Sequence, residues 1–176
     1  MKQLAIVING CGGVGKDTLC QMAARHYKVR NISSVTPIKE LAAQCGWNGA
    51  KDNRSRKFLS DLKRLCANYN DYPNRWVHGQ YLDFLKGDEQ VLFVHIREGA
   101  EIKKFVESTG GRARTLLIRG GSRFLRRKRT YGNASDDGVE NYPYDYYYTN
   151  DRSLAEAEAE FCALIGSMLE EAPDAP

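Results

Sequence analysis

The sequence lacks the features that mark membrane-spanning and secreted proteins. No apolar run approaches the ~20 residues that a membrane helix requires. The first residues do not combine a basic region, an apolar core and a cleavage site, so no signal peptide is visible. We therefore expect a cytoplasmic protein without a membrane partner.

The sequence lacks the closely paired cysteines of a disulfide framework or a zinc site. The five cysteines are an odd number, and no two of them are close enough to form a C-x-x-C pair. This argues against a disulfide framework and against a zinc site, and it favours reduced thiols in a cytosolic protein. Cys11 lies inside a glycine-rich segment, where we expect it to be a small residue that the loop tolerates.

Internal repeats and low-complexity linkers are also missing, and 176 residues are enough for one domain with a hydrophobic core. The hydrophobic content of 42% and charged content of 27% are ordinary for a soluble globular protein. The net charge of +4 is uneven, because residues 112–129 hold eight basic and no acidic residues, which leaves about −4 for the rest (4 − 8). Such a cationic segment indicates a polyphosphate ligand, nucleic acid or a solvated basic face.

The most informative segment present is 10–18, which follows the apolar run 4–8. Its spacing G-x-x-x-x-G-K is that of a phosphate-binding loop between a strand and a helix, except that Asp17 separates Lys16 from Thr18. The glycines would let backbone N–H groups approach a phosphate at the helix N-terminus, and Lys16 would reach the β- and γ-phosphates. Asp17 or Thr18 would hold Mg²⁺ directly or through water. The predicted nucleotide-binding residues of this loop are Gly10, Gly12, Gly13, Val14, Gly15, Lys16, Asp17 and Thr18.

Strands and helices alternate along the rest of the chain. Apolar runs predict strands over residues 3–9, 29–33, 91–95, 115–118 and 144–148. Helical spacing predicts helices over residues 16–27, from Pro37 (with Thr36 as N-cap) to near Gly46, and over 55–69, 75–85, 100–107 and 153–171. Pro73 should break the third of these helices, and Ser153 with Glu156 has the spacing of a capping box.

This alternation predicts an α/β fold with a parallel sheet covered on both faces. Ligands of such sheets bind at the carboxyl ends of the strands. We therefore expect the glycine loop, Ser33, Ser34, Arg97 and the residues after Ile118 to surround one crevice.

Several segments, in this order, resemble the nucleoside monophosphate kinase branch of the P-loop kinases. They are 15–18 (GKDT), 34–40 (SVTPIKE), 56–62 (RKFLSDL), 93–102 (FVHIREGAEI) and 144–151 (YDYYYTND). The phage-type deoxynucleoside monophosphate kinases are the most similar, and animal-type phosphomevalonate kinase shares the G-K-D pattern. The resemblance implies a single domain over 1–176 with a three-layer P-loop kinase fold and a five-stranded parallel sheet. It also implies an acceptor-binding helical region at about 36–88 and a basic lid at 119–143.

The resemblance further implies that ATP and Mg²⁺ are the cofactors and that the γ-phosphoryl group passes to a small-molecule acceptor, such as a (deoxy)nucleoside monophosphate. Lys16, Arg97, Arg123 and Arg127 are then the expected catalytic residues, with Arg126 and Arg129 also in the lid. Arg119 would stack on adenine or meet a phosphate. Asn150 and Asp151 would contact adenine through backbone groups or simply turn the chain.

Weaker expectations concern the acceptor. Lys39 and Arg56 are candidates to bind it, although charges on helix faces usually point to solvent. Aromatic residues around the same helices could stack on an acceptor base or belong to the core. These residues are Trp47, Tyr69, Tyr72, Trp76 and Tyr81. The tyrosines between 142 and 148 favour strand packing over base binding.

One position departs from the family pattern, because His95 stands where the family has an acidic residue that organises Mg²⁺ or the acceptor. Asp17 or Glu98 would then take over this task, or it is lost. His95 itself is either a satisfied imidazole or a catalytic group.

Two alternative functions stay open. One is a nucleotide-binding regulatory protein with little turnover, in which His95 marks lost chemistry. The other is a polynucleotide end kinase whose basic segment holds a nucleic acid backbone. The basic segment lacks regular aromatic interleaving, which disfavours a nucleic-acid partner.

Overall fold

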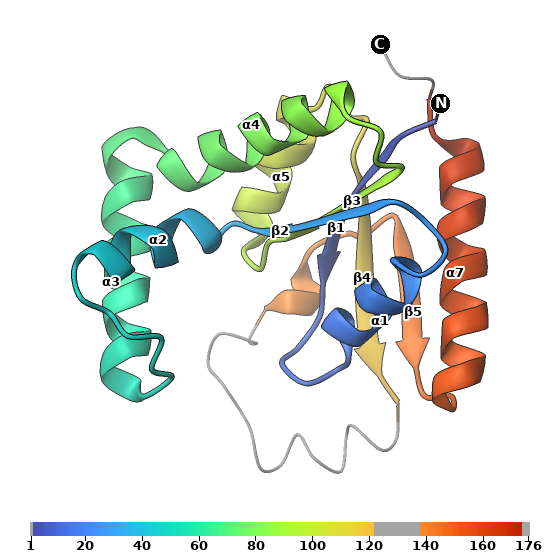
Figure 1. Cartoon of the computed structure of the whole chain (residues 1–176), viewed down its shortest axis with the longest axis horizontal. Helices are drawn as coiled ribbons and strands as arrows, with labels where there is room; N and C mark the ends of the chain where they lie inside the picture. Colours follow the sequence, from blue (N-terminus) through green and yellow to red (C-terminus); the bar gives the residue numbers. More distant parts are fainter. Residues whose placement is uncertain (1, 122–137, 174–176) are drawn as a thin grey trace.

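The computed structural model describes residues 2–121 and 138–173, and it contains a five-stranded parallel sheet between two layers of helices (Figure 1). The strand order is β2-β3-β1-β4-β5, and every neighbouring pair is parallel. The strands are β1 (Leu4–Asn9), β2 (Val29–Ser33), β3 (Val91–His95), β4 (Arg114–Gly120) and β5 (Tyr146–Asn150). The predicted fold class is thereby confirmed, while most of the predicted basic lid lies outside the described residues.

The helices lie in the connections between strands, except α7, which follows the last strand. They are α1 (Lys16–Ala23), α2 (Thr36–Gln44), α3 (Asn53–Asn70), α4 (Tyr72–Lys86), α5 (Gly99–Ser108) and α7 (Leu154–Glu171), with a 3₁₀ turn η2 (Val139–Asn141). Within the part of the chain that is described, no helix is long and apolar enough to cross a membrane.

The core consists of two apolar layers, one on each face of the sheet. In β1, Leu4, Ile6 and Ile8 face the layer beneath α1 and α7, whereas Ala5 and Val7 face the layer beneath α4 and α5. Successive strand residues point to opposite faces, so a strand that is covered on both faces must be apolar throughout. All six residues of β1 are buried, which explains why its continuous apolar run predicted a strand correctly.

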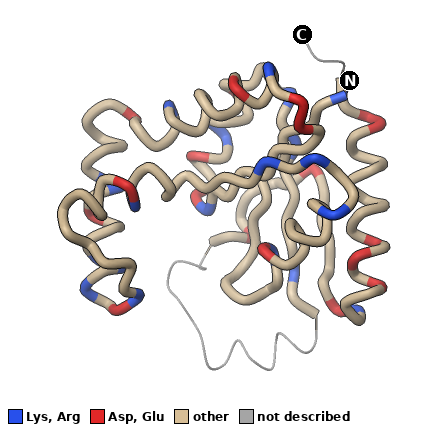
Figure 2. Tube along the Cα trace, viewed as in Figure 1, with Lys and Arg blue, Asp and Glu red and all other residues tan. Residues whose placement is uncertain are grey.

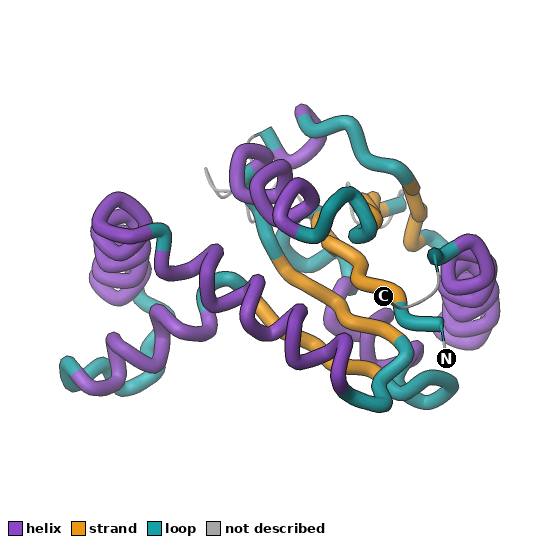
Figure 3. Tube along the Cα trace, turned by 90° about the horizontal axis from the view of Figure 1, so that it is seen from above, coloured by secondary structure: helices purple, strands orange, loops and turns teal. Residues whose placement is uncertain are grey.

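The helical region between β2 and β3 is anchored differently from the other helices. Figures 1 and 3 show α3 lying off to one side of the sheet, next to α2 and α4. Only Ser55 of its 18 residues is buried, and Phe58, Leu65 and Tyr69 are 37%, 59% and 87% exposed. The amphipathic pattern therefore predicted the helix correctly, but its apolar side chains lie outside the main core.

Several predicted boundaries were wrong, each for a local reason. Helix α1 ends at Ala23 rather than at Tyr27. Val35, and not Thr36, is the N-cap of α2, because the Val35 carbonyl accepts a hydrogen bond from Lys39 N at 3.0 Å. Pro73 lies in the first turn of α4, where its missing N–H costs no helical hydrogen bond.

The last strand begins two residues later than predicted, at Tyr146. The preceding Asp145 uses its side chain for pairing, because Asp145 Oδ2 accepts hydrogen bonds from Thr115 N and Thr115 Oγ1, each at 2.8 Å. A side chain thus closes the start of the β4–β5 pair where backbone pairing was expected.

The capping box of α7 gives the first testable prediction. Ser153 Oγ accepts from Glu156 N, and Ser153 N donates to Glu156 Oε2 at 3.1 Å. We expect Ser153→Ala to lower the free energy of unfolding by about 1 kcal/mol, because an N–H group of the first turn loses its acceptor. Urea denaturation measures this, with Ser167→Ala, at an exposed position in the C-terminal part of α7, as the control. An equal effect of both substitutions would contradict a capping role.

Candidate functional site

The glycine loop connects β1 to α1 at the carboxyl edge of the sheet (Figure 1). Gly15 is the N-cap of α1 with a φ of 94°, and no side chain among the described residues caps this helix. A helix N-terminus without a side-chain cap is where a phosphate-binding loop receives its anion.

Close packing explains two of the loop glycines. A Cβ on Gly10 would lie 2.4 Å from the Ile118 carbonyl oxygen, and one on Gly15 would lie 2.6 Å from Asn150 Nδ2. Gly10 and Gly13 also have positive φ values of 144° and 79°. Gly12 is not among the glycines with a positive φ.

Lys16 is folded back over the loop. Its Nζ donates to the carbonyl oxygens of Gly10 and Cys11, the latter at 3.0 Å. The next residues on the first turn of α1, Asp17 and Thr18, are exposed. Carboxylate and hydroxyl oxygens are ligands that suit Mg²⁺, so this turn fits the predicted metal site beside a phosphate cradle.

A buried amide joins the glycine loop to the two neighbouring segments. Asn9, the last residue of β1, is 1% exposed. Its Oδ1 accepts from Gly10 N at 2.8 Å, and its Nδ2 donates to Arg97 O at 3.1 Å and to Tyr144 Oη at 2.8 Å. The Tyr144 hydroxyl in turn donates to Val139 O at 2.8 Å. Burial raises the pKa of Tyr144 to about 12, so its hydroxyl remains a donor at neutral pH.

Asn9 was missed by the sequence analysis. A signal was available, because Asn9 is the one polar residue of an otherwise apolar strand and directly precedes the loop. A buried polar side chain at such a position needs partners, and here the partners come from three segments.

Arg97 lies where the sequence predicted, in the turn between β3 and α5. The side chain is exposed, and the backbone carbonyl is held by Asn9. The following residue, Glu98, is the N-cap of α5. Because β1 and β3 are adjacent parallel strands, the glycine loop and this turn share the same edge of the sheet.

His95 occupies a satisfied position at the end of β3. Its Nε2 lies 2.8 Å from Asn31 Oδ1 on β2 and 4.0 Å from Cys20 Sγ on α1. Burial lowers the pKa of His95, and burial raises the pKa of the Cys20 thiol to about 12. Both side chains are therefore neutral at pH 7. Of the two interpretations that the sequence left open, this geometry fits the satisfied imidazole.

Two of the three residues predicted near adenine, Asn150 and Arg119, have different surroundings. Asn150 Nδ2 donates to Val14 O at 2.9 Å, which ties the end of β5 to the glycine loop. The Arg119 guanidinium lies 4.6 Å from the centre of the Tyr147 ring and 3.9 Å from Glu140. Since Ile118 faces the layer of α1 and α7, Arg119 points to the opposite face of the sheet. Their roles in nucleotide binding stay predictions.

The remaining predicted site residues lie on separate elements or outside the described residues. Lys39 on α2 and Arg56 on α3 are exposed, Tyr81 is a core residue at 5% exposure, and Trp76 packs against the core. Trp47 and Tyr72 are half-buried. Arg123, Arg126, Arg127 and Arg129 lie outside the described residues.

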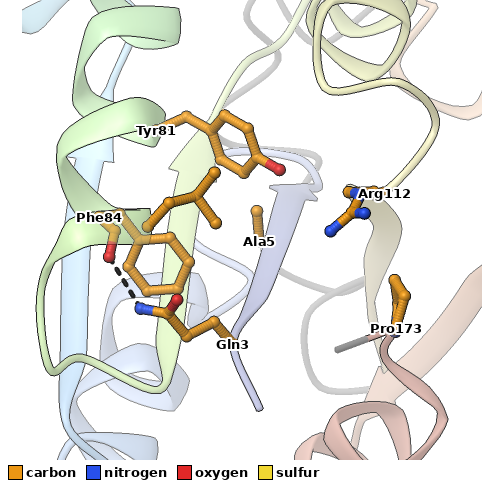
Figure 4. A pocket seen from close by; sticks show the side chains of 7 residues that line it. Gln3, Ala5, Tyr81, Phe84, Arg112 and Pro173 are labelled. Carbon is orange, nitrogen blue, oxygen red and sulfur yellow. Dashed lines mark hydrogen bonds between the residues drawn. The ribbon is translucent and has the colours of Figure 1, made fainter. Parts of the chain in front are cut away.

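A small pocket lies at the other end of the sheet, away from the glycine loop (Figure 4). It is lined by Gln3, Ala5, Tyr81, Phe84, Leu85, Arg112 and Pro173. Gln3 Nε2 crosses it to donate to Phe84 O at 2.8 Å. Because it flanks the start of β1, this pocket is separate from the candidate site.

The environment of His95 predicts a pH dependence of stability. Burial makes the folded pKa lower than the unfolded value, so the unfolded chain binds the proton more readily. The stabilising contribution is complete above about pH 6.5 and is lost as the pH falls toward the folded pKa. Urea denaturation between pH 7.5 and 5.5 should show a larger loss in the wild type than in His95→Gln. Parallel profiles of the two proteins would contradict this assignment.

Comparisons with known proteins agree on the fold. No protein-family model matches the chain, and the search of curated proteins gives no match. Among solved structures, a gluconokinase from Sinorhizobium meliloti is similar at a TM-score of 0.54 and 16% identity, covering 96% of this chain and 94% of that one. The tunicamycin resistance protein of Deinococcus radiodurans gives a TM-score of 0.56 at 12% identity, with coverages of 94% and 96%. Thymidylate kinase from Candida albicans gives 0.53 at 10% identity, with coverages of 94% and 92%.

These structural matches extend over nearly the whole chain, but the sequence identity is very low. They establish the architecture, and the narrower resemblance to phage-type enzymes stays a prediction. Together with the glycine loop between β1 and α1, they show that this chain has the fold of the P-loop kinases.

Proposed function

We propose that the protein is a kinase that transfers the γ-phosphoryl group of Mg-ATP to a phosphorylated small molecule, namely a nucleoside monophosphate, in the cytoplasm. The observation that carries this proposal is the link through Asn9, which joins the glycine loop to the turn of Arg97 by hydrogen bonds of 2.8 and 3.1 Å. A donor site and an acceptor site that are held side by side are what a phosphoryl transfer between two bound molecules requires.

The proposed step breaks the bond between the γ-phosphorus and the oxygen that bridges it to the β-phosphate. A new bond forms between that phosphorus and an oxygen of the acceptor phosphate, giving ADP and a diphosphate. The chain contributes position and positive charge. Lys16 would leave the Gly10 and Cys11 carbonyls for the phosphates, while Asp17 and Thr18 would hold Mg²⁺, which supplies charge neutralisation when bound.

Basic residues on the turn after β3 and on α3 support a negatively charged acceptor. Arg97 lies at the carboxyl edge of the sheet. Lys and Arg positions, with an acidic position beside them, lie at the end of α3 that extends toward the same side of the molecule as the glycine loop (Figure 2). Arg56 belongs to this group. It precedes Lys63 by seven residues, about two helical turns, so it shares a face with Lys63. Lys63 Nζ in turn contacts Glu98, next to Arg97.

A coupled assay of ADP formation tests this function, with Mg-ATP and each of the common ribo- and deoxynucleoside 5′-monophosphates. We expect turnover that requires an acceptor, and a loss of kcat on the order of 10²-fold or more in Lys16→Ala, because the transferring group loses a cation. Arg97→Ala should raise the acceptor KM roughly tenfold or more and change the KM for ATP little. Lys86→Ala, on the exposed last turn of α4, is the control.

Two outcomes would count against the proposal. Tight binding of ATP without transfer to any of these acceptors would favour a regulatory nucleotide-binding protein. Turnover that occurs only with a phosphate-free acceptor would keep a kinase and exclude the acceptor phosphate from the role of nucleophile.

A further inference from the structure

Helix α3 needs an anchor other than the hydrophobic core. It packs against α2 and α4, and it buries only Ser55. A helix with so little buried apolar surface gains little fixed orientation from packing. Its orientation matters for the proposed function, because it decides where α3 presents Arg56, a proposed acceptor-binding residue.

Lys63 supplies a polar connection from α3 to the sheet edge. Its Nζ donates to Glu98 Oε2 at 3.0 Å and to Glu101 Oε2 at 2.8 Å, on residues 35 and 38 positions further along the chain. The Lys63 side chain is only 16% exposed, whereas Lys57 on the same helix is 77% exposed in its pair with Asp61. Exposed ion pairs such as Lys57–Asp61 contribute little to the stability of the fold. The ammonium group of Lys63 is mostly buried between two carboxylates, so its position is constrained.

The carboxylates that Lys63 holds belong to the turn that presents Arg97. Glu98 is the N-cap of α5, but its side chain makes no capping hydrogen bond and extends to Lys63 instead. Glu101 lies in the first turn of α5. On the other side of the same turn, Asn9 holds the carbonyl of Arg97. The backbone around Arg97 is therefore fixed from two directions.

The titration of the two carboxylates is consistent with this contact. Burial acts to raise the pKa of both carboxyl groups. At Glu98 the charge and the hydrogen bond of Lys63 outweigh burial, so the pKa of Glu98 is lowered. The pKa of Glu101 stays raised. Glu98 thus remains ionised next to Lys63 at neutral pH.

A second ion pair, Lys104–Asp71 at 3.3 Å, joins α5 to the start of α4. The Lys104 side chain is more exposed than that of Lys63.

We propose that Lys63 is a positioning residue for the acceptor half of the site: by holding Glu98 and Glu101 it fixes α3 against the Arg97 turn and keeps Arg56 and Arg97 at a constant separation. This inference rests on the proposed kinase function. Lys63 touches neither substrate in this account, and it acts through the two arginines. Its loss should therefore weaken acceptor binding without affecting the glycine loop.

The test compares Lys63→Met, Lys63→Arg and, as a matched control, Lys103→Met, which breaks an exposed pair with Glu107 on α5. The probe is the nucleoside 5′-monophosphate with the highest turnover in the panel above. We expect Lys63→Met to raise its KM roughly tenfold or more, with the KM for ATP within about twofold, because a small misplacement of binding groups is enough. Lys63→Arg should restore most of the acceptor affinity, and Lys103→Met should behave as the wild type.

Hydrogen exchange of the ligand-free proteins gives a readout that does not depend on activity. Lys63→Met should speed exchange in α3 and in the first turn of α5, and leave the amides of β1 and α1 unchanged. If Lys63→Met does not fold, Glu98→Gln and Glu101→Gln weaken the same contact from the other side and replace it in both measurements.

The outcomes separate this inference from the proposed function. Unchanged exchange in α3 and α5 would overturn the role of Lys63 whether or not the protein is a kinase. Faster exchange with an unchanged acceptor KM would also overturn it, since the contact would then be structural only. If the wild type turns over no acceptor, the proposed function fails, and this inference, which rests on it, fails with it even if exchange is faster.

Discussion

The buried amide of Asn9 is the constraint on which the candidate site depends. A polar side chain at 1% exposure must satisfy its hydrogen-bonding groups within the protein, because an orphaned group would cost about 1–3 kcal/mol. Asn9 meets this requirement by binding the first amide of the glycine loop, the carbonyl of Arg97 and the hydroxyl of Tyr144. Three chain segments that are distant in sequence are thereby held at one end of the sheet, next to the strand that carries the loop.

The two halves of the site are held by different physical means. The glycine loop lies on a strand buried on both faces, and it is tied to β5 by Asn150. The acceptor half includes α3, which has little core of its own and contacts the sheet edge through charged groups. Hydrophobic burial holds the first half rigidly, whereas hydrogen bonds and ion pairs hold the second. The position of the acceptor side therefore depends on a few specific polar contacts, of which the Lys63–Glu98 pair is one.

Much of the fold followed from local patterns in the sequence. Continuous apolar runs located the buried strands β1 and β3, and the glycine spacing located the loop at the correct edge of the sheet. Local patterns were insufficient where a long-range partner decides the outcome. The start of β5 depends on Asp145 pairing with Thr115, and α3 lies outside the core although its periodicity resembles that of a core helix.

The contacts that organise the site could not be read from the sequence for the same reason. Lys63 and Glu98 are 35 residues apart, and Asn9 and Arg97 are 88 residues apart. His95 is an instructive case, because the sequence showed a departure from the family pattern, and only the structure supplied its partner, Asn31. Spacing predicts which strand ends share an edge, but it does not predict which side chains meet there.

The most direct test of this account is a crystal structure with Mg²⁺ and a non-hydrolysable ATP analogue. We expect the β-phosphate to lie within the loop, against the backbone amides from Gly12 to Lys16. Lys16 Nζ should have left the Gly10 and Cys11 carbonyls for the phosphates, while the three hydrogen bonds of Asn9 remain. A nucleotide bound elsewhere, or a Lys16 that stays on those carbonyls with the loop occupied, would contradict the assignment of this edge as a phosphoryl-transfer site.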